Sequence, residues 1–446
     1  MQRATLWRSS GVALVAMALM LALITPSTAA RPPKPSSKPR NIIVFIGDGM
    51  GPEQVRLGRV YKEAPLHIDG VPWGAVGSLN TNSLDGVTDS AAGATALATG
   101  YETLNGWVGM IPTDPPTAVE SALEQAEDVG KATGLVTSVG MTNATPASFA
   151  AHVTDRGDDD VIAVQMHAQG SEFLMGAGSD AGLVNQPGVT YVDNVTEMNA
   201  YVAGPGTGPM YGLIGVESLA HPIDRVNEGV VGIEPTLPQM TAAALHVLSA
   251  DPQGFFLMVE DGAIDWAGHS RDGAWSATDM LQMDDAVKVA YDWAKSRTDT
   301  LILVTADHET GGLSFTTTGP ASGRIDVDGL QGQTASVEFM WGELKPNGVS
   351  LAEIEEVVER YTTIELTEGE KADIMAIALL GSGEMGIADV LSDRWHVNWL
   401  QSGLDEGDHT DTPVPIYAWG PKASDFAGTA YVNERVGQLL LSYLGA

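Results

Sequence analysis

The sequence contains no cysteine, and basic and aromatic residues are scarce in it. Lys and Arg together number 23 against 57 Asp and Glu, which gives a formal net charge of −34, and aromatic residues make up 6% of the chain. Without cysteine the chain forms no disulfide and cannot carry the lipid of a bacterial lipoprotein. The negative charge disfavours binding to nucleic acid or to an anionic membrane. Stability must therefore come from the core and from any bound metal.

A continuous apolar run long enough to cross a membrane is also missing. The most apolar stretch, Gly11–Ile24, follows Arg3 and Arg8 and precedes the small residues of Ser27–Ala30. This arrangement predicts a secretory signal peptide over residues 1–30, because a membrane anchor would need a longer apolar stretch. We therefore expect export to the periplasm or the extracellular space, and no membrane association after the signal is removed.

The composition of the chain supports two further expectations, one for the residues after the signal peptide and one for the whole protein. Residues 31–40 are rich in proline and lysine and are predicted to be a disordered linker. The acidity of the chain is typical of a well-solvated exported protein. Adaptation to high salt, where screening relieves charge repulsion, is the alternative explanation.

Short apolar runs alternate with helical patterns along the chain, which predicts an α/β fold with a large, mostly parallel sheet and helices on both faces. A helix is expected from the capping box Thr117–Glu120 to Gly130, followed by a strand over 133–139. Another helix is expected over Leu237–Leu248. Residues 156–236 are glycine-rich and predict loops with short elements.

The periodicity changes between about 316 and 400. Ser350–Glu353 and Thr367–Glu370 are capping boxes, and each is expected to open an acidic amphipathic helix. The sheet is predicted to resume at Pro413–Trp419. We interpret 41–446 as one catalytic domain that carries a cap-like insertion at about 316–400.

Acidic and histidine side chains follow three of the expected strands. These strands and the residues after them are Asn41–Gly47 with Asp48, Phe255–Val259 with Glu260, Asp265 and His269, and Thr300–Thr305 with Asp307 and His308. In an open α/β sheet the ligand crevice lies at the carboxyl ends of the strands, so these side chains are expected to converge. Convergence of this kind is what a hydrolytic site with several metal ions requires.

The residue types indicate which metals such a site would hold. Zinc favours histidine nitrogen and carboxylate oxygen, whereas magnesium favours oxygen alone. A zinc pair sharing a phosphate fits the set Asp48, Asp265, His269, Asp307, His308 and His409. Glu260 and Thr145 would add a neighbouring site with oxygen ligands only. Bound dications would also offset the repulsion between a negative chain and a phosphate ester.

Three shorter motifs each allow two interpretations. Gly47–Gly51 lacks the spacing of a dinucleotide-binding loop; its Asp48 is either a metal ligand or the cap of a tight turn. Ser90 stands at the start of a helical run, either as an N-cap or as a nucleophile beside the free N–H groups of the helix. Arg156 either holds phosphate with two N–H donors or pairs at the surface with Asp155 or Asp158.

Taken in order, seven motifs resemble those of the alkaline phosphatase family. They are Gly47–Gly51, Thr88–Ala92, Ala144–Ala147, Phe256–Glu260, Ile264–Asp265 with His269, Thr305–Gly312, and His409–Thr410. The resemblance extends from about residue 41 to the C-terminus and is weakest in 316–400. One such motif is weak evidence, whereas seven in the same order are specific.

The resemblance implies an activity and a role for each residue. It implies hydrolysis of small phosphate monoesters through a phosphoseryl intermediate on Ser90, with two Zn²⁺ and one Mg²⁺. Arg156 would hold the phosphate and Asp89 would orient Arg156. The implied ligands are Asp265, His269 and His409 for the zinc on the water side, Asp48, Asp307 and His308 for the zinc beside the serine, and Asp48, Thr145 and Glu260 for magnesium. A homodimer is one assembly that the resemblance allows.

Two residues depart from the family pattern. Asn143 stands where Asp or His is usual, and a neutral Asn would attract a cation less strongly. Trp266 stands where Lys or His is common, and it either packs or stacks near the substrate entrance. The third metal site is therefore the least securely implied.

Other functions remain as alternatives to a phosphomonoesterase. A phosphodiesterase or mutase with the same metal core would need a pocket for a second ester group. A sulfatase is disfavoured because the chain has neither an oxidisable cysteine nor a Ser-x-Pro-x-Arg substitute. A non-catalytic metal- or phosphate-binding protein would need the ligands and Arg156 but not Ser90 at a helix start.

Overall fold

The computed structural model describes residues 38–178, 180, 182–204, 208–315, 324–344, 349–400 and 408–445. The predicted signal peptide and most of the predicted linker lie outside the described residues. Arg40, the last linker residue, donates its backbone N–H to the carbonyl of Asp299 at 2.7 Å, so it already joins the start of the sheet.

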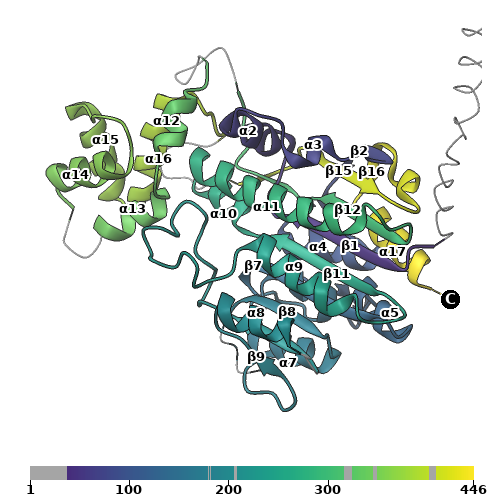
Figure 1. Ribbon diagram of the computed structural model, residues 1–446. Coiled ribbons are helices and arrows are strands. Elements are labelled where there is room, and N and C mark those ends of the chain that lie inside the picture. The colour runs from purple at the N-terminus through teal and green to yellow at the C-terminus, as the bar shows by residue number, and fades with distance from the viewer. Residues whose placement is uncertain are drawn as a thin grey trace, which may run out of the picture. The chain divides into compact units, whose positions relative to one another are not determined.

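A ten-stranded sheet forms the centre of the domain (Figure 1). Its order is β16-β2-β15-β12-β1-β11-β7-β8-β10-β9, and β15 alone runs antiparallel to its neighbours. The predicted mostly parallel α/β fold is confirmed. In chain order the strands are β1 Asn41–Gly47, β2 Ala75–Asn80, β7 Ala132–Gly140, β8 Phe173–Ala177, β9 Thr190–Tyr191, β10 Met210–Leu213, β11 Phe255–Asp261, β12 Thr300–Thr305, β15 Val414–Trp419 and β16 Gly428–Val432.

The central strands are buried on both faces. All seven residues of β1, all seven of β11 and all six of β12 are buried. Continuous apolar runs are what a parallel strand covered by helices on both sides requires, because both sets of alternating side chains face packed layers. The described residues also form three two-stranded ladders: β3 Asn82–Ser83 with β4 Gly86–Val87, β5 Met110–Ile111 with β6 Thr117–Ala118, and β13 Glu309–Thr310 with β14 His409–Thr410.

Helices cover both faces of the sheet (Figure 1). Helices α9 and α11 pack on one face, and α5 and α6 on the other, where α4 and α17 join them. These helices are α4 Ser90–Thr99, α5 Ala122–Asp128, α6 Ala144–Ala150, α9 Leu237–Leu248, α11 Gly273–Ala294 and α17 Glu434–Leu444. The remaining helices beside the sheet are α2 Pro52–Lys62, α3 His67–Gly70, α7 Asp159–Gln169, α8 Val195–Ala203, α10 Ala263–His269 and the short 3-10 helix Ala423–Phe426.

Two expectations for the first half of the chain are wrong in detail. The capping box that opens α5 is Ser121 with Glu124, not Thr117 with Glu120. Thr117 lies in β6, where pairing with β5 determines its conformation. Residues 156–236 are also more ordered than expected, since β8 and β10 extend the sheet in parallel register beyond β7. Their glycines obscured the strand pattern.

In the segment expected to be a cap-like insertion, the described residues form five helices: α12 Val327–Gly332, α13 Val337–Leu344, α14 Leu351–Tyr361, α15 Glu368–Ala378 and α16 Gly383–Trp395. Both predicted capping boxes are present, at the starts of α14 and α15. These helices enclose a second apolar cluster that also includes Trp275 and Ala274 of α11. Burial of this shared apolar surface ties the segment to the main domain.

Candidate active site

Three neighbouring strands place the predicted ligands at one edge of the sheet. Ile46 of β1 is level with Glu260 of β11 on one side and with Thr305 of β12 on the other. The residues that follow these strands therefore emerge together. Gly49 allows close packing there: it adopts a φ of +69°, and a Cβ on it would lie 2.8 Å from the Cα of Asp265.

Asp265, His269 and His409 form the first group of side chains. Helix α10 carries Asp265 and His269 one turn apart, with His269 Nε2 at 3.2 Å from Asp265 Oδ2. His409 Nε2 lies 3.5 Å from Asp265 Oδ1 and 3.2 Å from His269 Nε2. Because the carbonyl of Thr88 accepts from His409 Nδ1 at 2.8 Å, the lone pair of this imidazole is on Nε2, facing the other two side chains.

Asp48, Asp307 and His308 form the second group. His308 Nε2 lies 3.3 Å from Asp48 Oδ1 and 3.4 Å from Asp307 Oδ2. The other carboxylate oxygen of Asp307 accepts from the backbone N–H of His308 at 3.0 Å and of Gly49 at 3.4 Å. All three side chains are buried, and each has a carboxylate or imidazole atom available to the same point.

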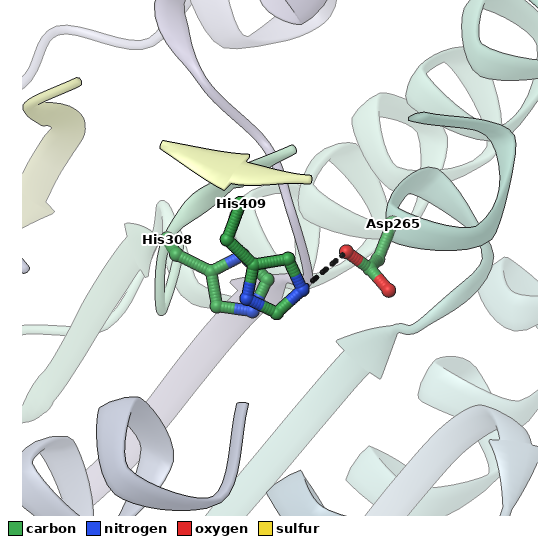
Figure 2. Close-up of side chains that lie close together, drawn as sticks. All are labelled: Asp265, His308 and His409. Carbon is green, nitrogen blue, oxygen red and sulfur yellow. Dashed lines mark ion pairs between the residues drawn. The ribbon is translucent and has the colours of Figure 1, made fainter. Parts of the chain in front are cut away.

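The two groups touch each other. The His308 ring stacks on the His409 ring with 3.6 Å between centroids, and Asp265 faces both rings (Figure 2). Thr310 links the groups, because its hydroxyl donates to Asp265 and accepts from His308 Nδ1 at 3.2 Å. These two bonds leave the lone pair of His308 on Nε2, the atom that faces Asp48 and Asp307.

Glu260 and Thr145 provide the third group, which offers only oxygen atoms as ligands and lies next to the second group. Glu260 is fully buried at the end of β11 and accepts a 2.5 Å hydrogen bond from Thr137 through Oε2. Its Oε1 and the Thr145 hydroxyl are buried without a hydrogen bond of regular geometry to any described residue, as is Asp48 Oδ1. Buried oxygens without partners are unfavourable unless a cation or water satisfies them, so this set fits a magnesium ion.

The electrostatics of the protein alone also indicate bound cations. Burial, reinforced by repulsion from Asp307 and Asp265, raises the pKa of Asp48 well above its usual value. Burial likewise raises the pKa of Asp307 strongly and that of Glu260 to about 7. For Asp265, burial alone would raise the pKa, but the hydrogen bond and charge of His269, with His308 and His409, bring it below its usual value. Dications bound here would relieve the repulsion among these carboxylates.

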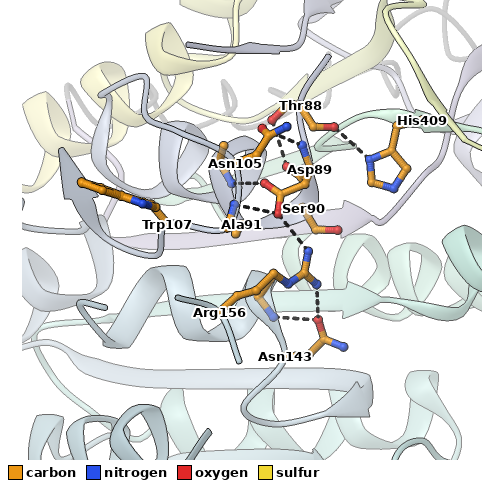
Figure 3. Close-up of polar contacts among 12 residues, drawn as sticks. Thr88, Asp89, Ser90, Ala91, Asn105, Trp107, Asn143, Arg156 and His409 are labelled. Atoms are coloured by element: carbon orange, nitrogen blue, oxygen red, sulfur yellow. Dashed lines mark hydrogen bonds and ion pairs between the residues drawn. The ribbon is translucent and has the colours of Figure 1, made fainter. Parts of the chain in front are cut away.

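Ser90 is the first residue of α4 and is not its N-cap, so of the two interpretations of this serine the capping one does not hold. Asp89 caps the helix instead, through a 3.0 Å hydrogen bond from the backbone N–H of Ala92 (Figure 3). The Ser90 hydroxyl is therefore not used as a cap, and its Oγ lies 3.2 Å from His308 Nε2. This contact places a buried hydroxyl directly against the second group of side chains.

Arg156 faces the start of α4 and not Asp155 or Asp158. Its Nη1 lies 3.2 Å from Asp89 Oδ2, and its Nη2 donates to Asn143 Oδ1 at 3.2 Å (Figure 3). The surface-pair interpretation is therefore wrong. The guanidinium is held from two sides, and its charge offsets a small part of the burial effect that raises the pKa of Asp48 and of Glu260. An arginine fixed in this way is suited to bind two oxygens of a phosphate.

The two departures from the family pattern have distinct surroundings. Asn143 is the N-cap of α6, where its Oδ1 accepts from Ala144 N at 2.7 Å as well as from Arg156. It thus anchors the helix that carries Thr145. Trp266 lies with its ring centroid 6.1 Å from that of His221, beside the second apolar cluster, which favours the packing interpretation.

Several residues that shape the site were not found by sequence reasoning. Thr137 and Thr310 bond to predicted ligands, and Asn105 Oδ1 accepts from the backbone N–H of Asp89 at 3.1 Å. Glu309 accepts from Thr410, the residue after His409. A threonine next to a ligand motif is a weak signal. Asn105 lies on a loop after α4, 16 residues from Asp89 and outside the seven motifs, so sequence spacing did not reveal its contact.

Comparison with known proteins agrees with this geometry. The family model for alkaline phosphatase matches residues 39–175 and 178–444. Alkaline phosphatase 3 of Bacillus subtilis (strain 168) is 30% identical over 417 residues, covering 87% of this chain and 86% of its own length. The crystal structure of Thermus thermophilus alkaline phosphatase is 26% identical, with a TM-score of 0.81 over 95% of this chain and 96% of that one. A cold-active alkaline phosphatase from Shewanella sp., also 26% identical, gives a TM-score of 0.79 over 91% and 100%.

The chain therefore belongs to the alkaline phosphatase family, as its seven motifs predicted. It is a phosphate-monoester hydrolase. Among the described residues, none of the helices has the length and apolar character that a membrane span needs.

Proposed function

We propose that this enzyme hydrolyses small phosphate monoesters through a phosphoserine on Ser90, with two Zn²⁺ and one Mg²⁺ as cofactors. The observation that carries the proposal is the 3.2 Å contact between Ser90 Oγ and His308 Nε2, at the start of α4 and next to Arg156. Asp265, His269 and His409 would hold one zinc, Asp48, Asp307 and His308 the other, and Asp48, Thr145 and Glu260 the magnesium.

The proposed reaction has two displacements at phosphorus. Ser90 Oγ forms a bond to phosphorus as the bond to the leaving alcohol breaks, and the alcohol takes up a proton. Water then attacks the phosphoserine from the opposite side, the P–Oγ bond breaks, and inorganic phosphate leaves. When bound, the metal ions would lower the pKa of the serine hydroxyl and of water and stabilise the charge on the leaving oxygen.

The protein residues position the phosphate. Arg156, fixed between Asp89 and Asn143, would hold two of its oxygens, and the amino end of α4 would favour its negative charge. Contacts of this kind bind the phosphoryl group and not the alcohol. Catalysis would then depend mainly on orientation and charge stabilisation.

Substitution of Ser90 by alanine tests the nucleophile. Ser90→Ala should keep its metal content, measured by mass spectrometry of the ions, but lose several orders of magnitude in turnover of p-nitrophenyl phosphate. Acid quenching during turnover should trap a phosphorylated peptide containing residue 90 in the wild type only. The exposed Ser424→Ala variant is the matched control. A Ser90→Ala enzyme with unchanged turnover would exclude the phosphoserine.

Two further measurements separate the alternatives. Chelation should abolish turnover and added Zn²⁺ and Mg²⁺ should restore it, which a metal-independent phosphatase would not show. Bis(p-nitrophenyl) phosphate should be hydrolysed far more slowly than the monoester, whereas the reverse order would indicate a diesterase. We also propose export with cleavage after residue 30, which the mass of the secreted protein would test, and light scattering would show whether a homodimer forms.

A further inference from the structure

A cavity of about 660 Å³ lies between the 215–234 loop and helix α13. The loop is anchored to the main sheet, because Leu219 N donates to the carbonyl of Ser138 in β7 at 2.9 Å. Figure 1 shows this loop between the sheet and α13. The volume is within the usual range of small-molecule sites, roughly 300–1,000 Å³.

The lining of this cavity is strongly acidic. Six of its residues carry carboxylates and none is Lys or Arg; the acids are Glu217, Asp224, Glu228, Glu234, Glu338 and Glu343. Arg225 lies 3.9 Å from Glu234 and its charge also acts on Glu228, and Arg360 lies 2.7 Å from Glu343. Within the described part of the chain, no Lys or Arg forms a salt bridge with Glu217, Asp224 or Glu228.

Burial is the main cause that raises the pKa of two of these acids, and neighbouring carboxylates add to it. Burial, together with the charges of Asp272 and Glu228, raises the pKa of Asp224 to about 7, although hydrogen bonds from Ser336 oppose the shift. Burial and the charge of Glu234 raise the pKa of Glu228 as well. A positively charged ligand would reduce this repulsion.

His221 gives a second, independent indication of a ligand. It lines the cavity, is 9% exposed, and its imidazole forms no hydrogen bond with any residue that the structure describes. Burial lowers the pKa of His221 to about 4, so the ring is neutral at pH 7 and offers an acceptor nitrogen. Phe339, on the α13 side, adds an aromatic ring to the lining, and such rings attract cations.

The cavity is close to the proposed reaction centre. His221 contacts Trp266 edge to face, with 6.1 Å between ring centroids, and Trp266 is the residue after Asp265 on α10. An alcohol that leaves from a phosphate near Asp265 and extends past Trp266 would reach the cavity. The position, volume and charge of the cavity and its unpaired acceptor therefore all indicate a small, positively charged ligand that donates hydrogen bonds.

We propose that this cavity receives the cationic part of the leaving alcohol, so that the preferred substrates are phosphate monoesters of amino sugars or similar polyamines. The proposal rests on the phosphomonoesterase function proposed above and adds a substrate class to it. The ammonium groups would donate hydrogen bonds to the carboxylates and to the His221 ring, while the phosphate lies against Ser90 and Arg156.

Two substrates of nearly equal size test this preference. They are the 6-phosphate of a glucosamine disaccharide, with free amines, and its N,N′-diacetyl form, assayed with the metal-loaded enzyme. At low ionic strength kcat/KM should be at least about fivefold higher for the free amine, since charge complementarity favours it. The ratio should approach one in roughly 0.5 M NaCl, where exposed charges are screened.

Substitutions of lining residues test whether the amine preference arises in the cavity. Glu217 and Glu338 are both exposed residues of the lining, so Glu217→Gln and Glu338→Gln are expected to fold normally. Each should lower the amine preference severalfold without changing turnover of p-nitrophenyl phosphate. Asp128→Asn makes the same charge change at the exposed end of α5, by the opposite end of β7, and should leave the preference intact.

The possible outcomes distinguish this inference from the proposed function. Equal kcat/KM for the two sugars at low salt, with normal p-nitrophenyl phosphate turnover, would overturn the cavity proposal alone. If Asp128→Asn lowers the amine preference as much as Glu338→Gln does, the preference arises from the net charge of the protein, and the cavity proposal is overturned as well. Absence of turnover with every monoester would refute the proposed function, and this inference with it.

Discussion

Asp89 connects the start of helix α4 to Arg156. One of its carboxylate oxygens caps the helix through Ala92 N at 3.0 Å, and the other lies 3.2 Å from Arg156 Nη1. The second oxygen also accepts from Gly106 N at 2.9 Å. The helix that positions Ser90 and the arginine that faces it therefore share one side chain as a partner, and Asn143 holds the arginine from its other side.

Substitution of Asp89 should separate its capping of α4 from its positioning of Arg156. Asn can still cap the helix through its Oδ1, but its Nδ2 cannot accept from Gly106 N, so Asp89→Asn should unfold at a slightly lower temperature than the wild type. It should bind inorganic phosphate about tenfold more weakly, because Arg156 loses its charged partner. Asp89→Ala should in addition lose about 1 kcal/mol of stability. Competitive inhibition by phosphate and thermal unfolding are the measurements. Equal phosphate affinity in Asp89→Asn and wild type would contradict the positioning role.

Glu260 should destabilise the metal-free enzyme at neutral and alkaline pH. Burial raises its pKa to about 7, so folding favours its protonated form. Its contribution to stability is therefore greatest at acid pH and falls as the pH rises from about 4.5 to 7. In chelator at pH 8, Glu260→Gln should unfold at a higher temperature than wild type, whereas added Mg²⁺ should stabilise the wild type more. A lower unfolding temperature of the metal-free variant would show that Glu260 is satisfied without a cation.

Glu309 should matter for metal retention although it is not one of the predicted ligands. Its carboxylate accepts from Gln54 Nε2 at 2.8 Å, from Leu313 N at 3.2 Å and from the Thr410 hydroxyl. Glu309→Gln should lose roughly 1–3 kcal/mol of stability, because buried partners are left unsatisfied. It should also release zinc faster during dialysis, since Thr410 adjoins His409. Glu63→Gln, at an exposed position, is the control, and equal zinc retention in both variants would argue against a link to His409.

The helices of the 324–400 segment should lose stability in acid. The hydrogen bond from Arg394 lowers the pKa of Glu370 to about 2, assisted by Thr367 and opposed by burial. Because this pKa is depressed, its stabilising effect is present above about pH 4.5 and disappears as the pH falls towards 2. Glu370→Gln keeps a residue suited to the capping box but removes the ion pair. Between about pH 5 and 3, its unfolding temperature should therefore fall less than that of the wild type, as differential scanning calorimetry would measure.

The sequence was sufficient to predict the centre of the fold because its signals are local. Each of β1, β11 and β12 contains a short apolar run that an acidic residue follows within two positions, and buried parallel strands require such runs. The capping boxes at Ser350 and Thr367 were also correct, since the surface helices they begin have no competing strand partner. The family resemblance added residue roles that spacing alone does not provide.

The remaining features depend on contacts between distant segments. Thr117 has the same local pattern as a helix start, but pairing with β5 makes it a strand residue. The reversed direction of β15 and the placement of β8 and β10 at one side of the sheet leave no periodic signal in the chain. Arg156 was ambiguous because its neighbours Asp155 and Asp158 are equally plausible partners, and only the fold brings Asp89 and Asn143 to it.

The ladder of β13 and β14 brings residue 310 level with residue 409. Helices α12 to α16 lie between these two residues in the sequence, whereas His409 itself is oriented by the carbonyl of Thr88, which accepts from its Nδ1. We therefore expect this segment to tolerate replacement by a shorter or longer one, provided that polar residues cover the apolar surface around Trp275. The β13–β14 ladder would keep His409 in place, and hydrolysis with it, while the residues around the substrate changed.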